Sequence, residues 1–214
     1  MKFGLFGSAQ AKRGGPDVDS AKGYKAWLDF NIEAEQLGFH STFAVEHHFT
    51  GFGQVSATVN LLTYLAAQTS TIRLGSAVMV LPWHNPVLLA EQVATLDLLS
   101  GGRFDFGVGK GYRFNEFKGF RIPMEDAEGR FEESLKILTK SFTEDEPWTY
   151  EGDFWSFEDV IVEPPTAQPT PTDPFAGMTG SQATSPRAAL EAAALGSLAP
   201  PVAAAPPPVP PAVE

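Results

Sequence analysis

The sequence predicts an α/β fold built on a parallel β-sheet. Between residues 1 and 142, short apolar segments alternate with segments whose apolar side chains recur at helical spacing. Strict alternation of this kind implies parallel strands joined by right-handed crossovers. Two architectures are compatible with it, an open doubly wound sheet and a closed eight-stranded barrel. A barrel typically needs ~250 residues, whereas this chain has 214 and four clear strand–helix units.

The first two units come from the amino-terminal part of the chain. We expect a strand over residues 3–9 and a helix over 23–37, after which Gly38 provides a C-terminal cap. The second unit pairs a strand over 41–45 with a helix over 55–68.

The third and fourth units follow the same pattern. Residues 72–81 are nearly all apolar, as expected of a parallel strand that is covered on both faces. Pro86 suits the first turn of a helix that extends to Leu99. The fourth unit is a strand over 103–108 and, after a charged and aromatic excursion, a helix over 129–142.

The composition of the chain changes after the fourth unit. Residues 147–163 predict a β-hairpin that turns at 151–153, because aromatic and polar residues alternate on both sides. Residues 164–214 then contain 13 of the 18 prolines. Such a segment buries too little apolar surface to offset its conformational entropy, so we expect it to be disordered, above all the Ala/Pro-rich tail at 198–214.

Charge and composition exclude several classes of function. The formal net charge of −11 argues against nucleic acid or an anionic membrane as a partner. The chain has no cysteine, which excludes disulfides, thiolate metal sites and cysteine nucleophiles. We see no targeting segment, and the longest apolar run, residues 76–81, is too short to span a membrane. A cytoplasmic location is the expectation.

Glu46, His47 and His48 end the second predicted strand. Histidine exchanges protons near neutral pH, so an imidazole at a strand end is a candidate acid, base or hydrogen-bond donor. In an extended chain Glu46 and His48 point one way and His47 points the other. The competing interpretation is a pair of hydrogen-bonded loop residues. We expect no metal site, because only His40 and His84 could add further imidazoles.

A glycine-rich segment, residues 107–111, ends the fourth predicted strand. Its glycines allow the backbone to approach a ligand closely, and Lys110 adds a positive charge. A dinucleotide-binding fingerprint would need a glycine where Tyr112 stands, and a phosphate-binding P-loop would need Ser or Thr where Gly111 stands. A tight strand-to-loop turn without function is the alternative.

Three of the predicted loops share one end of the sheet. They follow the second, third and fourth strands, and the latter two include residues 83–86 and 113–118, which we expect to be exposed loops. Ligands of α/β folds bind at this carboxyl end of the strands.

Three stretches, taken together, resemble the bacterial luciferase-like family of flavin-dependent monooxygenases. They are EHHFTGFG at 46–53, LGSAVMVLPWHNPVLLAEQVATLDLLSGGRFDFGVGKG at 74–111 and FEESLKIL at 131–138, and the resemblance extends from residue 1 to about 165. It implies a (β/α)₈ barrel in which reduced FMN, supplied by a flavin reductase, reacts with O₂ to oxidise a small organic substrate. Some relatives use the deazaflavin F420, which stays an alternative.

The resemblance also implies roles for particular residues. His47 would be catalytic near the flavin, and Glu116 would be a carboxylate close to it. Ala77 and Val78 would contact the isoalloxazine ring, often through a non-proline cis peptide bond.

The flavin phosphate would be bound by two further segments. The first is the glycine-rich segment with Gly109, Lys110 and Gly111, in which Lys110 faces the phosphate. The second is a weaker match over residues 177–196, which implies a remnant of a fifth strand and its helix within 166–197, with Gly180, Ser181 and Thr184 at the phosphate.

Two departures from the family shape the expectation. Gly109 stands where luciferases carry a reactive cysteine, which favours a generic luciferase-like oxidoreductase over light emission. Family members are longer, so we expect a truncated barrel of about four to five β/α units over residues 1–165. A homodimer or a related subunit could complete it. A non-catalytic partner subunit and an inactive fragment are the alternative functions.

Overall fold

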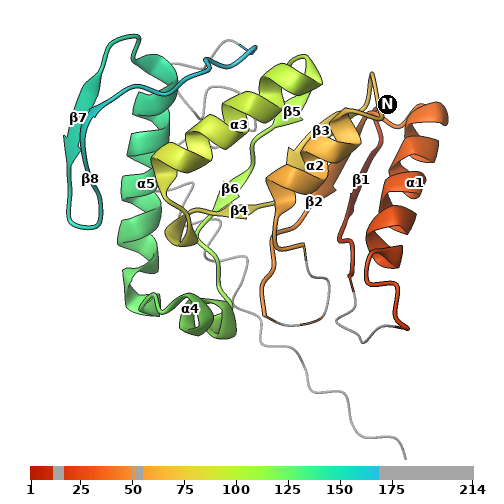
Figure 1. Ribbon diagram of the computed structural model, residues 1–214, viewed down its shortest axis with the longest axis horizontal. Helices are drawn as coiled ribbons and strands as arrows, with labels where there is room; N and C mark the ends of the chain where they lie inside the picture. The colour runs from red at the N-terminus through yellow and green to blue at the C-terminus, as the bar shows by residue number, and fades with distance from the viewer. Residues whose placement is uncertain (12–16, 50, 52–54, 169–214) are drawn as a thin grey trace, which may run out of the picture. The chain divides into compact units, whose positions relative to one another are not determined.

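A computed structural model describes residues 1–11, 17–49, 51 and 55–168 of the chain (Figure 1). The possible fifth-strand remnant, the Ala/Pro-rich tail, and with them Gly180, Ser181 and Thr184, lie outside the described residues.

The sheet is parallel, and its strands follow one another in chain order. Its strands are β1 (Gly4–Gly7), β2 (Ser41–Ala44), β3 (Arg73–Ser76) and β5 (Phe104–Asp105), in the order β1-β2-β3-β5. A doubly wound sheet reverses its strand order at a switch point, whereas a barrel adds each strand beside the previous one. The observed order is therefore that of a barrel wall.

Two predicted strands are each split in two. Short strands β4 (Met79–Val80) and β6 (Val108–Gly109) pair separately from β3 and β5, so the continuous strands expected at 72–81 and 103–108 were wrong. The split has a local cause. The Ser76 hydroxyl donates to the Gly107 carbonyl at 2.8 Å and accepts the Gly107 N–H at 3.0 Å, and so takes the place of a regular strand ladder.

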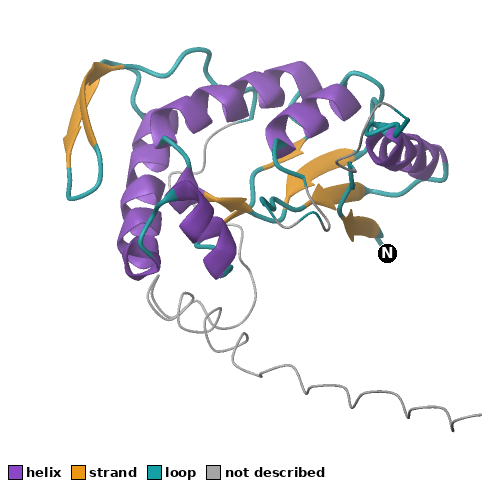
Figure 2. Cartoon of the chain, turned by 60° about the horizontal axis from the view of Figure 1, so that its bottom comes forward, coloured by secondary structure: helices purple, strands orange, loops and turns teal. Residues whose placement is uncertain are grey.

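Four long helices cover one face of the sheet (Figure 2). They are α1 (Lys22–Gln36), α2 (Thr58–Ala66), α3 (Pro86–Ser100) and α5 (Ala127–Thr143), with α3 packed between α2 and α5. The core between helices and sheet includes fully buried Leu62, Leu65, Leu74, Leu89, Leu96 and Ile137. Among the described helices, none combines the length and apolarity needed to cross a bilayer.

The helix ends follow local chemistry that the sequence carries. Gly38 has a left-handed φ of 84° directly after α1, as predicted. Pro86 opens α3, and the Asn85 side chain accepts the N–H groups of Val87 and Leu88, both at 3.1 Å. These contacts satisfy backbone donors that a helix leaves unpaired in its first turn.

Residues 113–118 do not form the exposed loop that we expected. A short helix, α4 (Phe114–Phe120), covers most of this segment, and Glu116 and Phe117 are buried. The cause is tertiary, because Phe117 and Phe120, three residues apart on one face, both pack against Trp83 at ring distances of 5.4 and 5.3 Å. Two 3₁₀ turns, η1 (Leu81–Trp83) and η2 (Met124–Asp126), precede α3 and α5.

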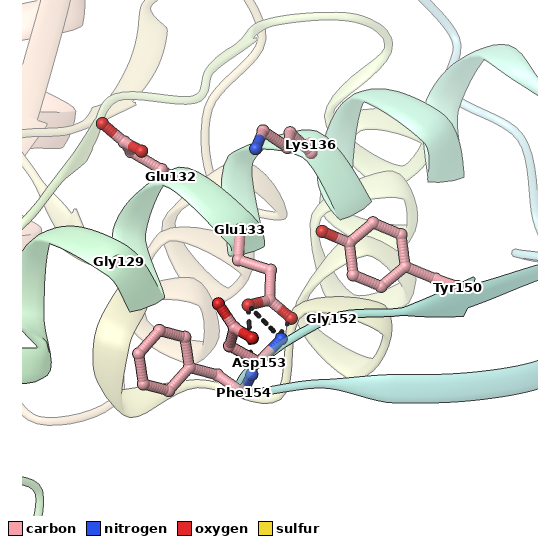
Figure 3. A pocket seen from close by; sticks show the side chains of 8 residues that line it. All are labelled: Gly129, Glu132, Glu133, Lys136, Tyr150, Gly152, Asp153 and Phe154. Atoms are coloured by element: carbon pink, nitrogen blue, oxygen red, sulfur yellow. Dashed lines mark hydrogen bonds between the residues drawn. The ribbon is translucent and has the colours of Figure 1, made fainter.

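The expected hairpin is formed by β7 (Trp148–Glu151) and β8 (Ser156–Val160), which pair antiparallel. The buried Glu133 of α5 anchors its turn (Figure 3). The Glu133 carboxylate accepts the backbone N–H groups of Asp153, Phe154 and Trp155 at 2.8–3.1 Å. The turn is therefore fixed to the helix by a carboxylate that accepts hydrogen bonds from three backbone donors.

Replacing Glu133 with alanine should leave these three donors without partners and destabilise the hairpin. We expect the free energy of unfolding to fall by about 2 kcal/mol, the usual cost of losing hydrogen bonds to a charged group. Denaturant unfolding, with amide exchange at Asp153–Trp155, would measure it. The exposed neighbour Glu132 serves as control, since Glu132→Ala removes the same charge without the contacts. Equal stability of the two variants would contradict the anchor.

Candidate functional site

The histidine pair lies on an extended segment, residues 45–48, which continues β2 beyond its carboxyl end. The Val45 N–H donates to the carbonyl of Gly7 at 3.4 Å, and the His47 N–H donates to the carbonyl of Val55 at 3.0 Å. The Thr58 hydroxyl of α2 donates to the Val45 carbonyl at 2.9 Å. Backbone contacts from both sides thus keep the segment extended, so successive side chains point to opposite sides.

His47 is held by Glu116 of α4. The two residues are 69 positions apart, and His47 Nδ1 lies 3.1 Å from Glu116 Oε1. The same oxygen accepts the His48 backbone N–H at 2.8 Å. A carboxylate only accepts hydrogen bonds, so the proton of a neutral His47 ring is on Nδ1 and Nε2 carries the lone pair. The pair therefore orients an imidazole whose Nε2 can accept or return a proton.

A second carboxylate, Glu46, is on the opposite side of the segment and is 2% exposed. Its Oε1 accepts from Nε2 of His48 at 3.1 Å and from Nε2 of His84 at 2.7 Å, and its Oε2 accepts the Val80 N–H at 2.6 Å. Burial alone would raise the pKa of Glu46, but these hydrogen bonds and the nearby His84 outweigh burial and lower that pKa below its ordinary value.

Aromatic rings surround the His48 imidazole and separate it from solvent. The His48 ring centroid is 4.8 Å from that of Phe120 and 5.4 Å from that of Trp83, both edge to face. Trp83 and Phe120 stack on each other at 5.3 Å. This packing fixes His48, and it also joins α4 to the residues before α3, so Glu116 is presented to His47 from a rigid support.

An open cleft of about 290 Å³ lies beside His47. Its lining residues are Phe6, Gly7, Ser8, Val45, His47, Tyr112 and Arg113. They come from the carboxyl ends of β1, β2 and β6, the end at which α/β folds bind ligands. The His47 side chain is 18% exposed, so it is accessible from the cleft while its Nδ1 is engaged.

The residues expected at the flavin lie together around β4 and β6. The Ala77–Val78 peptide bond is cis. A Cβ placed on Gly109 would lie 2.5 Å from Val78 Cγ2, and one on Gly111 would lie 2.6 Å from Val80 Cγ1. The glycines thus let the two segments approach each other. Lys110 is partly exposed, and its Nζ is 3.8 Å from Glu128 Oε2.

Three residues of the site, Glu46, His84 and Arg113, were not assigned a role from the sequence. Glu46 and His84 form one hydrogen-bonded cluster with His48, and Arg113 lines the cleft. The alternation of side chains did indicate that Glu46 and His48 share a side. Only tertiary packing brings His84 to them. Within the described part of the chain, no group of three His, Asp or Glu side chains is arranged to hold a metal ion.

A second cleft, of about 230 Å³, lies between α5 and the hairpin (Figure 3). Its most buried charged residue, Glu133, is fully engaged by the backbone of the turn. Burial and the nearby carboxylates of Glu133 and Asp153 raise the pKa of Tyr150 there. Because its carboxylate already has protein partners, Glu133 has a structural role in this cleft.

The Glu46 cluster predicts a pH dependence of stability. Its lowered pKa contributes stability that is complete above the ordinary value of 4.5 and is lost as the pH falls below 4.5 through the folded pKa. Glu46→Gln should therefore be less stable than the parent chain at neutral pH, and the difference should shrink in acid. Denaturant unfolding from about pH 3 to 7 would test this, with Glu132→Gln as control. A difference that does not vary with pH would contradict it.

The chain is similar to known proteins over most of its length. Residues 1–206 match a family model described as luciferase-like monooxygenase. Among curated relatives, the uncharacterised protein y4vJ of Sinorhizobium fredii is 33% identical over 89% of this chain and 53% of its own length. A 4-hydroxyprotoasukamycin monooxygenase of Streptomyces nodosus subsp. asukaensis is 33% identical over 66% of this chain and 38% of its own. The alkanal monooxygenase alpha chain of Photorhabdus luminescens is 34% identical over 67% and 39%. The chain thus spans about half the length of these relatives, or less.

Solved structures show the same fold. Monooxygenase RslO1 of Streptomyces bottropensis matches with a TM-score of 0.71 and 34% identity over 78% of this chain and 50% of its own. The oxygenating constituent of 3,6-diketocamphane monooxygenase from Pseudomonas putida, in complex with FMN, matches with a TM-score of 0.66 and 23% identity over 74% and 43%. An F420-dependent secondary alcohol dehydrogenase has a TM-score of 0.65 and 19% identity over 80% and 51%. The chain, with its parallel β/α wall and strand-end histidines, therefore belongs to the luciferase-like monooxygenase family.

Proposed function

We propose that this chain carries the catalytic end of an oxidoreductase that uses reduced FMN and O₂ to oxygenate a small organic substrate. The observation that carries the proposal is the His47–Glu116 pair. It places an oriented imidazole on the wall of a cleft at the carboxyl end of the sheet. Such a group can exchange a proton with a ligand in that cleft, which is what general acid–base catalysis requires.

Two cationic residues beyond the carboxyl end of β6 fit a flavin phosphate. Lys110 is exposed, and Arg113 is partly exposed and lines the cleft, in a chain whose net charge is −11. Lys110 would bind the phosphate, and the Ala77–Val78 segment would support the flavin ring. When bound, reduced flavin supplies the electrons with which O₂ is activated. FMN is bound in one fold neighbour and F420 serves another, so F420 is the alternative cofactor.

The protein's own part is to orient groups, exclude water and move a proton. Glu116 keeps the His47 proton on Nδ1 and so leaves Nε2 to act as the base. After it has accepted a proton, the imidazolium is stabilised by the carboxylate at 3.1 Å. The aromatic packing around His48 keeps water from the other side of the segment.

Partners follow from the proposed chemistry. A flavin reductase would supply reduced FMN, and O₂ and an organic molecule would be the substrates. Relatives include an alkanal monooxygenase alpha chain and a beta chain, so association with a second copy or a related subunit is part of the proposal. A non-catalytic subunit or an inactive fragment is the alternative that the next two tests address.

Anaerobic titration of the full chain with reduced FMN should show saturable micromolar binding by a non-aggregated species. Lys110→Ala should lower the affinity for FMN by about tenfold and the affinity for riboflavin much less, because only FMN carries the phosphate to which Lys110 would donate a charged hydrogen bond. Fluorescence or calorimetry would give both affinities, and riboflavin serves as the internal control. Equal losses would remove Lys110 from the phosphate site. Tighter binding of reduced F420 than of FMN would reassign the cofactor.

His47→Ala should lower turnover by about 10²–10⁴-fold, the usual contribution of a positioned acid–base group, without loss of folding. The measurement is oxidised product formed per reduced FMN, in a reductase-coupled assay on a substrate found by screening. His40→Gln is the matched control, since His40 is at the amino end of β2, away from the cleft. Unchanged turnover in folded His47→Ala would remove His47 from the mechanism.

A further inference from the structure

The Arg113 side chain has neither a carboxylate nor a backbone carbonyl as a partner among the described residues, whereas two other arginines of the fold have partners of these kinds. Arg73 forms an ion pair with Asp105, and Arg103 donates to backbone carbonyls, including those of Ala66, Thr69 and Ile72. Among the described residues no carboxylate lies within ion-pair distance of Arg113. Its contacts are instead with its neighbour Tyr112, whose ring centroid is 5.7 Å from the guanidinium carbon. The guanidinium therefore keeps most of its donors for a ligand.

The backbone of Arg113 is fixed relative to His47. The Arg113 carbonyl accepts the N–H groups of Glu116 at 3.0 Å and Phe117 at 3.3 Å, and so joins the residue to the first turn of α4. Glu116 is also the residue that holds His47. The Arg113 backbone and the His47 imidazole are thus both hydrogen-bonded to Glu116, and both residues line the same cleft.

The cleft lining defines the chemistry of a complementary ligand. Among the described residues that line the cleft, Arg113 and His47 are the ionisable cations and none is an acid. Phe6 and Tyr112, which are 71% and 66% exposed, supply aromatic surface to the cleft. Such a lining fits a molecule with an anionic group for the arginine fork and an apolar ring for the aromatic walls. The volume of about 290 Å³ limits it to a small molecule.

We propose that Arg113 is a specificity-determining residue that binds the carboxylate of a small aromatic substrate and brings its ring system to His47. This proposal rests on the proposed monooxygenase function, because it names the substrate class for the same cleft. The anionic oxygens could also come from the flavin phosphate, which offers the arginine the same chemistry. The test must therefore separate the two sources.

The test compares two naphthalene probes, one with an anionic carboxylate and one with a neutral hydroxymethyl group at the same ring position. 2-Naphthoate and the neutral 2-naphthalenemethanol are titrated into the full chain without flavin, and binding is followed by calorimetry. We expect the naphthoate to bind about tenfold more tightly, as one charge-assisted bidentate contact would give. Arg113→Gln should abolish this preference, whereas Lys118→Gln should retain it, since Lys118 is exposed on α4, directly after Arg113, and does not line the cleft. Arg113→Lys should retain part of it.

A measurement on the parent chain covers the case in which Arg113→Gln fails to fold. The naphthoate, but not the alcohol, should shift the NMR resonance of the Arg113 side-chain N–H. Equal affinity for the two probes, or a preference that survives in Arg113→Gln, would overturn the proposal. If Arg113→Gln weakens FMN binding more than riboflavin binding and keeps the preference for naphthoate, then Arg113 binds the flavin phosphate instead. Because the naphthoate titrations contain no flavin, failure of reduced FMN to bind would reject the cofactor proposal separately.

Discussion

The arrangement of the site depends on two buried carboxylates on either side of one extended segment. A buried carboxylate is costly unless donors satisfy it. Glu46 accepts from two imidazoles and a backbone N–H, and Glu116 accepts from one imidazole and one backbone N–H. Because residues 45–48 are extended, each acid can serve only one side of the segment. The histidines are thereby fixed in opposite directions, His47 at the cleft and His48 among aromatic rings.

These carboxylates also join parts of the chain that are far apart in sequence. Glu46 connects β2 to β4 through the Val80 N–H and to the residues before α3 through His84. Glu116 connects α4 to both histidines. Loss of one of these hydrogen bonds would therefore displace the other groups bonded to the same carboxylate, since contacts that share partners are not energetically independent. The Ala77–Val78 segment, where we propose that the flavin ring is supported, is next to one of these connections.

Local signals carried most of the fold, and tertiary contacts decided the rest. Helical spacing, Gly38 after α1 and Pro86 at the start of α3 are readable from neighbouring residues alone. The breaks after β3 and β5 are not, because they depend on the Ser76 hydroxyl reaching Gly107, 31 residues away. Helix α4 was missed for the same reason: its alternating charges and rings read as an exposed loop until Trp83 supplies the surface on which Phe117 and Phe120 pack.

The partners of the carboxylates separate functional from structural acids in this chain. Glu35 and Glu133 each accept three consecutive backbone N–H groups, and Glu35 also accepts the Thr71 hydroxyl of the same turn, so both acids serve to fix a turn. Glu116 accepts only one backbone N–H, and its other partner is an imidazole at a cleft. An acid whose donors all belong to one structural turn has no proton-exchanging side chain through which to act on a ligand. Glu116 has such a group, the His47 imidazole. Neither composition nor periodicity predicts this contact, so the catalytic proposal rests on this site and not on the barrel fold itself.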